Sequence, residues 1–419
     1  MDAGTLAWGI TSSALVLFMT PGVAFFYGGL VKAKSVISMM MMSFGAMALI
    51  AVLWILYGFN MAAVSDPWAF AGNPFSNFAL SSPELSSSDF VLALFGSTFA
   101  IITVALISGA IADRARFGSW MIFAGVWATV VYFPVAAWVW GGGWIMNLGT
   151  TLFGEESGIA VLDYAGGTAV HINAGAAALA LALVLGKRIG FQKGIQKPHN
   201  VPLVMLGASI LWFGWFGFNA GAEANWLNGD GSYGAMGPDS LAGVIVINTL
   251  GATAAAIIGW LIVEKFKDGK ATSVGAASGA VAGLVAITPA CAFLTPGWAL
   301  LLGLVTGVIC AFAIELKWKL GYDDSLDVVG IHLVGGVVGT LYLGFFATET
   351  GLFLGGGFEQ LAVQAIAAFG VLIYSFVVAW ILGFAIEKTM GFRIKNEDEL
   401  AGVDTSVHGE EGYSLAEQV

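Results

Sequence analysis

Long apolar stretches constrain this 419-residue chain more than any other feature. A helix that crosses the roughly 30 Å hydrocarbon layer of a bilayer needs about 20 apolar residues. Stretches of that length recur along the chain, and only 10% of its residues are charged while 58% are hydrophobic. A soluble domain has too small an interior for that apolar share, and its surface would aggregate. The sequence therefore predicts an all-α polytopic membrane protein.

The apolar stretches predict eleven transmembrane helices. Their approximate bounds are 6–30, 36–61, 90–112, 118–140, 159–186, 200–223, 239–263, 272–291, 297–316, 328–347 and 360–386. The first is expected to be a retained span, because neither a basic segment nor a small-residue cleavage site comes before it.

Lysine and arginine fall into six groups, and each group follows an odd-numbered predicted span. The groups are Lys32/Lys34, Arg114/Arg116, Lys187/Arg188/Lys193/Lys197, Lys265/Lys267/Lys270, Lys317/Lys319 and Lys388/Arg393/Lys395. One side of the membrane then holds every fixed cation, and the positive-inside rule makes that side cytoplasmic. We therefore expect a multi-pass cell-membrane protein with its N-terminus outside and its C-terminus inside.

The opposite loops carry acids alone. These acids are Asp66, Glu84, Asp89, Glu155, Glu156, Asp230, Glu349 and Glu359. An outer face of this kind attracts small cations and repels anions. The net charge of −11 argues against nucleic acid as a partner. Cys291 and Cys310 both lie within apolar stretches, so a disulfide framework and a CxxC metal site are excluded.

An odd span count suggests an inverted repeat of five plus five helices, a common plan in transport proteins. The predicted organisation is a transmembrane domain over 1–390 and a cytoplasmic regulatory tail over 391–419. Within the transmembrane domain the predicted divisions are a first half-repeat over 1–199, a second over 200–347 and an eleventh helix over 348–390.

Two of the four histidines, His171 and His332, fall at membrane depth in the fifth and tenth predicted spans. A buried imidazole needs a hydrogen-bond partner or a cavity. Each histidine is followed four residues later by glycine, Gly175 or Gly336, which permits close helix approach. One interpretation is a structural contact to a neighbouring carbonyl. Another is a narrow pore that passes a neutral polar molecule. Two ligands are too few for zinc, but a bis-histidine haem stays open as an alternative.

Carboxylates precede both histidines. Asp163 stands eight residues before His171, where it is expected to cap the fifth span and can also act electrostatically. Asp327 stands five residues before His332. Asp323 and Asp324 are interpreted as a solvated loop and a cap.

Aromatic residues concentrate near the predicted outer ends of the spans. Trp140, in V-W-G-G-G, is by default part of an interfacial belt, and the alternative is a cation site on its indole face. Phe95 and Phe99 share one helical face, a spacing that usually reflects packing.

Several short motifs follow one another in a fixed order along the chain. They are F-G-S-T-F followed by I-T-V-A-L-I-S-G-A-I-A-D-R, V-W-G-G-G, D-Y-A-G-G-T-A-V-H-I, G-W-F-G-F-N-A-G, A-I-T-P-A, D-V-V-G-I-H and, in the tail, G-F-R with H-G-E. Taken together, these motifs resemble the ammonium transporter (Amt/Mep/Rh) family over nearly the whole chain. Because the Rh branch lacks the outer tryptophan, Trp140 places the resemblance on the Amt side.

The resemblance implies a homotrimer in which each protomer has its own pore. An outer ammonium site would be formed by Trp140 and Phe99, with Asp163 beneath it as support. Phe99 would also stack on Phe218 as a gate above the twin histidines His171 and His332. Phe95 would lie nearby, at the vestibule.

One position departs from the family pattern. Ala222 stands where the family often has a serine whose hydroxyl helps to hold the cation, so the outer site is expected to be weaker or to rely more on aromatic faces.

The function implied is transport, not enzymatic catalysis, and no cofactor is expected. Ammonium, or methylammonium, would be bound outside, lose its proton and continue as ammonia past the histidines, while the proton moves separately. K⁺ cannot shed a proton and would carry its full desolvation cost into the pore. The alternatives are an ammonia gas channel, an ammonium sensor and, from another class, a bis-histidine haem electron-transfer protein.

The acidic tail allows two interpretations. By composition it would be solvated and disordered. However, G-F-R-I-K and H-G-E-E-G-Y resemble the ordered tail of the family, which helps to bind a trimeric PII-type regulatory protein at the cytoplasmic face.

Overall fold

The computed structural model of the protein describes residues 1–192, 194, 197–225 and 236–413, so Lys193, Asp230 and Glu417 lie outside the described residues. Its α-helices are α1 (Ala3–Leu30), α2 (Val36–Leu53), α3 (Phe59–Met61), α4 (Ser87–Ile107), α5 (Phe117–Trp127), α6 (Phe133–Val139), α7 (Leu148–Phe153), α8 (Asn173–Leu185), α9 (Val201–Asn225), α10 (Ala242–Asp268), α11 (Ser273–Ile287), α12 (Pro296–Ala313), α13 (Leu316–Leu320), α14 (Val334–Phe346), α15 (Phe358–Thr389) and α16 (Asn396–Ala401). Over the described ranges, β-structure is limited to an isolated bridge between Ala115 and Arg393.

Short 3-10 and π-helical segments extend several of these helices. They are η1 (Ala33–Ser35), η2 (Trp54–Gly58), η3 (Phe78–Leu80), η4 (Ser108–Ile111), η5 (Ala128–Tyr132), η6 (Glu155–Ser157), η7 (Gly167–Ile172), η8 (Val329–Leu333) and η9 (Asp404–His408). Joined in this way, ten helical stretches of the described chain are long and apolar enough to cross a membrane. The predicted eighth span corresponds to a shorter apolar helix, Ser273–Ile287. The all-helical, multi-pass prediction is confirmed, and the count of eleven stays a prediction.

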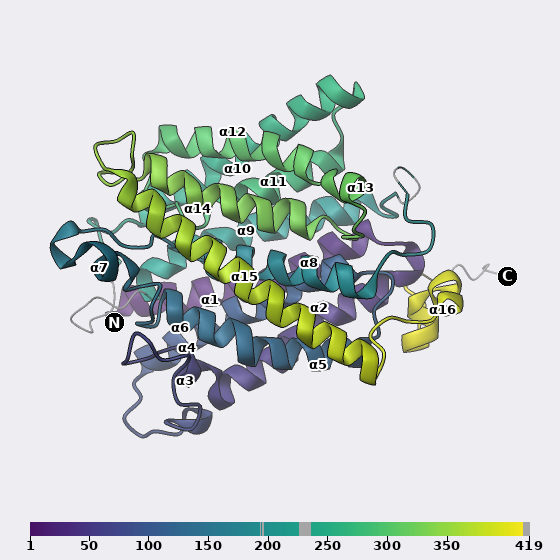
Figure 1. Ribbon diagram of the computed structural model, residues 1–419, viewed down its shortest axis with the longest axis horizontal. Helices are drawn as coiled ribbons and strands as arrows, with labels where there is room; N and C mark the ends of the chain where they lie inside the picture. Colours follow the sequence, from purple (N-terminus) through teal and green to yellow (C-terminus); the bar gives the residue numbers. More distant parts are fainter. Residues whose placement is uncertain (193, 195–196, 226–235, 414–419) are drawn as a thin grey trace.

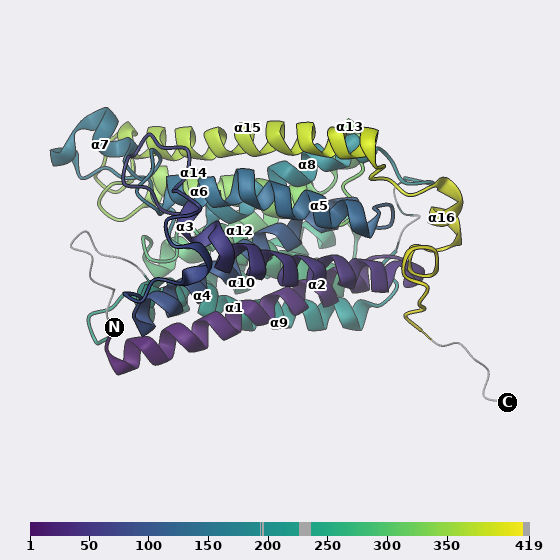
Figure 2. The same cartoon turned by 90° about the horizontal axis from the view of Figure 1, so that it is seen from below.

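The long helices run side by side, with the N-terminus at one end of the bundle and α16 at the other (Figures 1 and 2). The loops that carry the basic groups meet at the end that holds α13 and α16, called here the basic end (Figure 1). Contacts between these loops join Lys34 to Leu400, Arg188 to Asp113, Lys267 to Glu315, Lys317 to Asp324, and Arg393 to Leu185. The grouping of basic residues seen in the sequence therefore corresponds to one end of the folded protein.

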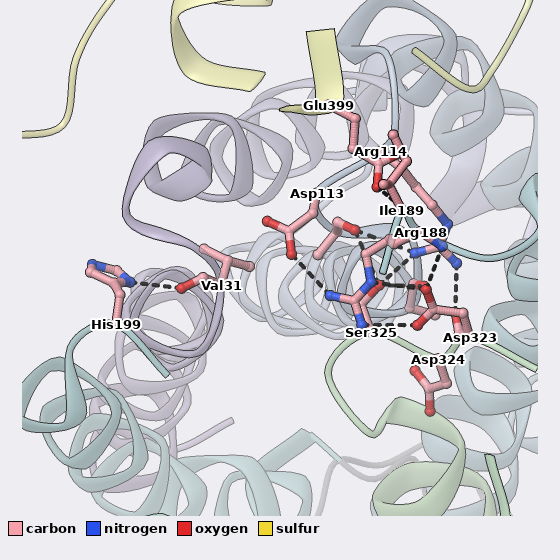
Figure 3. Close-up of polar contacts among 12 residues, drawn as sticks. Val31, Asp113, Arg114, Arg188, Ile189, His199, Asp323, Asp324, Ser325 and Glu399 are labelled. Carbon is pink, nitrogen blue, oxygen red and sulfur yellow. Dashed lines mark hydrogen bonds and ion pairs between the residues drawn. The ribbon is translucent and has the colours of Figure 1, made fainter. Parts of the chain in front are cut away.

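A buried ionic network closes the basic end (Figure 3). The Arg188 guanidinium donates to both carboxylate oxygens of Asp323 and to Asp113, each at 2.9 Å. Although burial lowers the pKa of Arg188, its hydrogen bonds and proximity to these carboxylates raise that pKa above its ordinary value. Burial lowers the pKa of Arg114, which donates to the Asp323 carbonyl, to about 10. The interpretation of Asp323 as solvated is wrong, because these arginines compensate its charge inside the protein.

Asp324 is also buried, 1% exposed, so a solvated loop is wrong for it too. Its Oδ2 accepts a hydrogen bond from the Val329 backbone at 2.7 Å, so the cap interpretation holds for this residue. Burial raises the pKa of Asp324 to about 6, against the opposing charge of nearby Lys317.

The tail is ordered over its described part, 391–413, so the expectation of a solvated, disordered segment is wrong there. Phe392 is fully buried, and its carbonyl accepts from the Arg116 amide at 2.8 Å. Further along, the Asp404 carboxylate accepts from the Ser38 amide at 2.7 Å, at the start of α2. The aromatic and carboxylate anchors offset the acidic composition that alone would favour disorder.

The two histidine-bearing spans share an unusual local geometry. His171 lies in the π-helical segment η7 and His332 in the π-helical segment η8, and each segment continues into an α-helix. A Cβ on Gly175 would lie 2.5 Å from the Leu333 amide nitrogen, and one on Gly336 would lie 3.0 Å from a carbonyl of η7. The predicted close approach at both glycines is thus confirmed, and it brings the two spans into backbone contact beside the histidines.

Candidate functional site

A cavity of about 510 Å³ opens toward the end of the bundle opposite the basic end, and we call it the outer cavity. Its wall includes Phe95, Phe99 and Trp140 together with Asp163 and Ala222. The structure therefore brings together five predicted site residues from α4, the end of α6, the 154–166 segment and α9. Most of the other lining residues are apolar, as is usual for a small-molecule site.

Two stacked rings form the floor of the outer cavity. Phe99 and Phe218 stack with centroids 4.1 Å apart and planes 14° apart. Phe95 lies 4.8 Å from Phe99, and Trp140 meets Phe99 edge to face at 6.0 Å. Phe99 lines the outer cavity while Phe218 lines a second void below, so the stacked pair separates the two spaces.

The second void is small and lies between the Phe99–Phe218 pair and the histidines. Its volume is about 10 Å³, enough for about one water molecule, and its wall includes His171, His332, Trp215 and Tyr27. The Nδ1 atoms of the two histidines are 3.2 Å apart, and their rings are nearly parallel, with an interplanar angle of 21°. His171 Nε2 is buried and accepts or donates no hydrogen bond among the described residues. The two Nδ1 atoms therefore contact each other. The structural interpretation, in which a histidine bonds to the carbonyl of a neighbouring helix, is wrong for these Nδ1 atoms.

Trp215 is a part of this site that sequence reasoning missed. Its indole stacks on the His171 ring, with centroids 5.4 Å apart and planes 18° apart, and its Nε1 donates to Thr288 at 2.8 Å. The signal was available, since Trp215 and Phe218 are three residues apart on α9 and so share a face.

Asp163 supports the outer cavity through the backbone. Its carboxylate accepts hydrogen bonds from four consecutive backbone N–H groups, those of Gly166, Gly167, Thr168 and Ala169, at 2.6–3.0 Å. The predicted capping role is confirmed by this geometry. Its carbonyl oxygen also accepts from Trp140 Nε1 at 2.8 Å, so the indole is fixed at the cavity wall and is not merely part of an interfacial belt.

A second carboxylate has the same spacing, which sequence reasoning missed. Asp324 precedes His332 by eight residues, as Asp163 precedes His171, and both cap the π-helical segment that carries the histidine. Asp327, which the sequence placed nearer to His332, instead pairs with Lys317 at 2.6 Å. Equal spacing in the two spans was the signal that could have identified Asp324.

Position 222 carries no side-chain acceptor. Ala222 lies on α9 one turn beyond Phe218 and lines the outer cavity. The polar groups on the wall of the outer cavity therefore come from other residues, among them Asp163 and Asn225.

Comparison with known proteins agrees with these features. The Ammonium Transporter Family model matches residues 7–413. The chain is 49% identical to an ammonium transporter of Mycobacterium tuberculosis (strain ATCC 25618 / H37Rv), over 99% of this chain and 91% of that protein. It is 39% identical to an ammonium transporter of Bacillus subtilis (strain 168), over 99% of both.

Solved structures give the same result. The crystal structure of Candida albicans Mep2 superposes with a TM-score of 0.83 at 32% identity, covering 95% of this chain and 88% of that chain. A protein described as a sensor Amt protein superposes with a TM-score of 0.84 at 26% identity, covering 96% and 97%. By its sequence and by its fold, the chain belongs to the Ammonium Transporter Family.

Proposed function

We propose that the protein binds ammonium in the outer cavity against Trp140 and Phe99, removes its proton, and conducts ammonia past the Phe99–Phe218 gate to His171 and His332. The order of features along the bundle supports this proposal. The outer cavity comes first, the stacked rings of Phe99 and Phe218 follow, and a void of about 10 Å³ lined by the two paired imidazoles lies beyond them. A neutral molecule the size of water fits that void, whereas a hydrated ion does not.

Selectivity over potassium follows from the same arrangement. The void is lined by apolar rings and two imidazoles, so it supplies too few oxygen ligands to replace the hydration shell of K⁺. Ammonium can leave its proton in the outer cavity and continue uncharged. The proton then moves separately, and net ammonium uptake results.

A haem between the histidines does not fit. Metal–imidazole bonds of about 2.0–2.1 Å on each side would need nitrogens about 4 Å apart, but the Nδ1 atoms lie 3.2 Å apart in direct contact. The nearby void of about 10 Å³ has no space for a porphyrin.

Two other candidates share the same pore. A gas channel would carry ammonia without net charge, and an ammonium sensor would use the site to signal, as the name of the sensor Amt protein suggests for that relative. Charge movement separates transport from both.

The decisive experiment measures currents on proteoliposomes attached to a solid-supported membrane. Ammonium pulses should give a transient current and potassium pulses none. His171→Ala and His332→Ala should admit potassium current, since each removes part of the polar lining that favours the neutral species. If ammonium pulses give no current while ammonia flux is intact, the gas channel is favoured. If both variants keep the wild-type selectivity for ammonium over potassium, the histidines have only a packing role.

We further propose eleven spans with the N-terminus outside, in a cell membrane, with each protomer of a homotrimer carrying its own pore. The span that would complete this count is the predicted eighth, the shorter helix α11 between α10 and α12. The confinement of the basic groups to one end supports this topology under the positive-inside rule.

The ordered tail is proposed to act as a regulatory element that helps a PII-type protein to bind. The Glu399 side chain accepts from the Ile189 amide at 2.6 Å and pairs with Arg393 at 2.8 Å, so the tail contacts the loop after α8 directly. Deletion after Met390 should lower activity and abolish capture of a PII-type protein in a pull-down. Full transport with undiminished capture would overturn the proposal.

A further inference from the structure

The wall of the outer cavity includes an extended segment, residues 160–164, which belongs to neither a helix nor a sheet. An irregular segment at membrane depth must find partners for its backbone N–H and C=O groups, because lipid offers none. Its far end is held by backbone contacts, in which Tyr164 donates to the Pro289 carbonyl at 3.2 Å.

The near end of this segment is held by two glutamines of α15. Gln364 Oε1 accepts from the Leu162 amide at 2.7 Å, and Gln364 Nε2 donates to the Leu162 carbonyl at 2.8 Å. The same Nε2 donates to the Thr340 carbonyl on α14 at 3.1 Å. Gln360, one turn earlier, donates to the Ala160 carbonyl at 2.8 Å. Both glutamine side chains are fully buried in α15.

The segment leads directly to the groups that shape the cavity. Leu162 precedes Asp163, whose carbonyl holds the indole of Trp140 and whose carboxylate caps the segment with His171. A shift of the Leu162 peptide therefore moves the indole and the cap together. Gln360 and Gln364 both belong to α15, a long helix that lies across the bundle and is part of neither half of the predicted repeat (Figure 1).

We propose that Gln364 is a positioning residue for the outer cation site: its amide fixes the Leu162 peptide, and through Asp163 it fixes the orientation of Trp140. A primary amide supplies one acceptor and two donors, which satisfy the N–H and the C=O of Leu162 and a second carbonyl, that of Thr340. Leucine supplies neither, and a carboxylate supplies acceptors alone. The inference rests on the proposed function of the outer cavity as the ammonium site.

The test measures methylammonium transport by full-length protein in proteoliposomes. Gln364→Leu should raise the apparent KM about tenfold, because the displaced indole loses its cation–π attraction, with a much smaller change in maximal rate. Gln360→Leu, which loses the hydrogen bonds to the Ala160 carbonyl and to Gln364 Oε1, should act in the same direction and more weakly. Ser375→Ala is the matched control, since it removes a buried hydrogen bond from α15 to Asn173 at 2.8 Å without touching the segment, and its KM should stay at the wild-type value.

Gln364→Glu provides a readout that a purely structural role would not give. A protonated carboxyl can donate to the Leu162 carbonyl, whereas an ionised one cannot. The ratio of variant to wild-type KM should therefore rise from about pH 6 to about pH 8, as the introduced carboxyl loses its proton.

The outcomes separate two failures. If wild-type protein moves no methylammonium, the proposed function fails. If wild-type protein transports normally but folded Gln364→Leu keeps the wild-type KM, or the Gln364→Glu ratio is independent of pH, the positioning role is wrong. If Gln364→Leu does not fold, the pH dependence of Gln364→Glu decides alone.

Discussion

The two carboxylates that precede the histidines by eight residues cap similar segments in different electrical surroundings. Asp163 accepts from four backbone N–H groups, and among the described residues no lysine or arginine pairs with it. Asp324 accepts from Val329, and Lys317 lies beside it with its ammonium 3.0 Å from the Asp324 carbonyl. The outer cap is thus compensated by dipoles and the inner cap by a fixed cation.

Under the proposed function, this difference predicts that cations enter from the outer cavity. Backbone dipoles stabilise the Asp163 charge without cancelling it, so a negative potential is expected there. At the basic end, Lys317 and Arg188 are paired with the carboxylates of Asp327, Asp323 and Asp113, so the charges compensate one another. Within the described chain, similar local geometry therefore accompanies an unpaired carboxylate at the outer cavity and a network of paired charges at the basic end.

The largest effect is expected from Asp163→Ala, the change that breaks the outer cap. Four N–H groups lose their acceptor, at a cost of about 1 kcal/mol or more each, and the residue 163 carbonyl that accepts from Trp140 is no longer held in place by the cap. Transport should fall below detection, and thermal unfolding in detergent should move to lower temperature. Asp324→Ala, which loses the hydrogen bond from the Val329 amide, should retain more activity. Equal losses in the two variants would abolish the distinction between the caps.

Arg188→Met tests whether the basic end depends on ion pairing. Removal of one partner leaves Asp323 and Asp113 buried without their main counter-charge, which typically costs about 3–5 kcal/mol. Unfolding measured by tryptophan fluorescence should show this loss. Addition of Asp323→Leu should restore part of the stability, and a double variant as unstable as the single one would show that the charges are not the cause.

Trp140→Leu should weaken cation binding at the outer end. The indole face contributes on the order of 1–2 kcal/mol to a desolvated cation, roughly a tenfold effect on affinity. Ala222→Ser should act in the opposite direction by a smaller factor, because it adds a hydroxyl acceptor to the cavity wall. Methylammonium uptake kinetics measure both, and an unchanged apparent affinity in both would remove the cation site from this cavity.

The smallest effect concerns pH at the inner cap. Burial raises the pKa of Asp324 to about 6 in the folded protein from 3.8, so its charged form destabilises the fold above about pH 6. That destabilisation is relieved as pH falls through 6 toward 4, where the folded protein binds the extra proton. The melting temperature of wild-type protein, relative to Asp324→Asn, should therefore rise by a few degrees over this range. A difference that is constant with pH would contradict the shift.

Hydropathy and basic residues determined the class of this protein, since the cost of placing charge and unsatisfied backbone in lipid is a local property of each segment. The same local reasoning placed His171 and His332 at membrane depth and Asp163 at a helix start. Family motifs then predicted the aromatic residues around the cavity. These features depend on neighbours close in sequence or on an inherited pattern.

Only the tertiary structure decided which groups meet. The spans are apolar nearly all round, so no polar stripe indicates which face of a helix turns inward, and helix rotation is set by packing at small residues such as Gly175. For that reason the sequence did not identify the stacking of Trp215 on His171, the burial of Asp323 or the hydrogen bonds between Gln364 and Leu162. Each of these contacts joins residues more than 40 positions apart, and the free energy that selects them arises when the helices assemble.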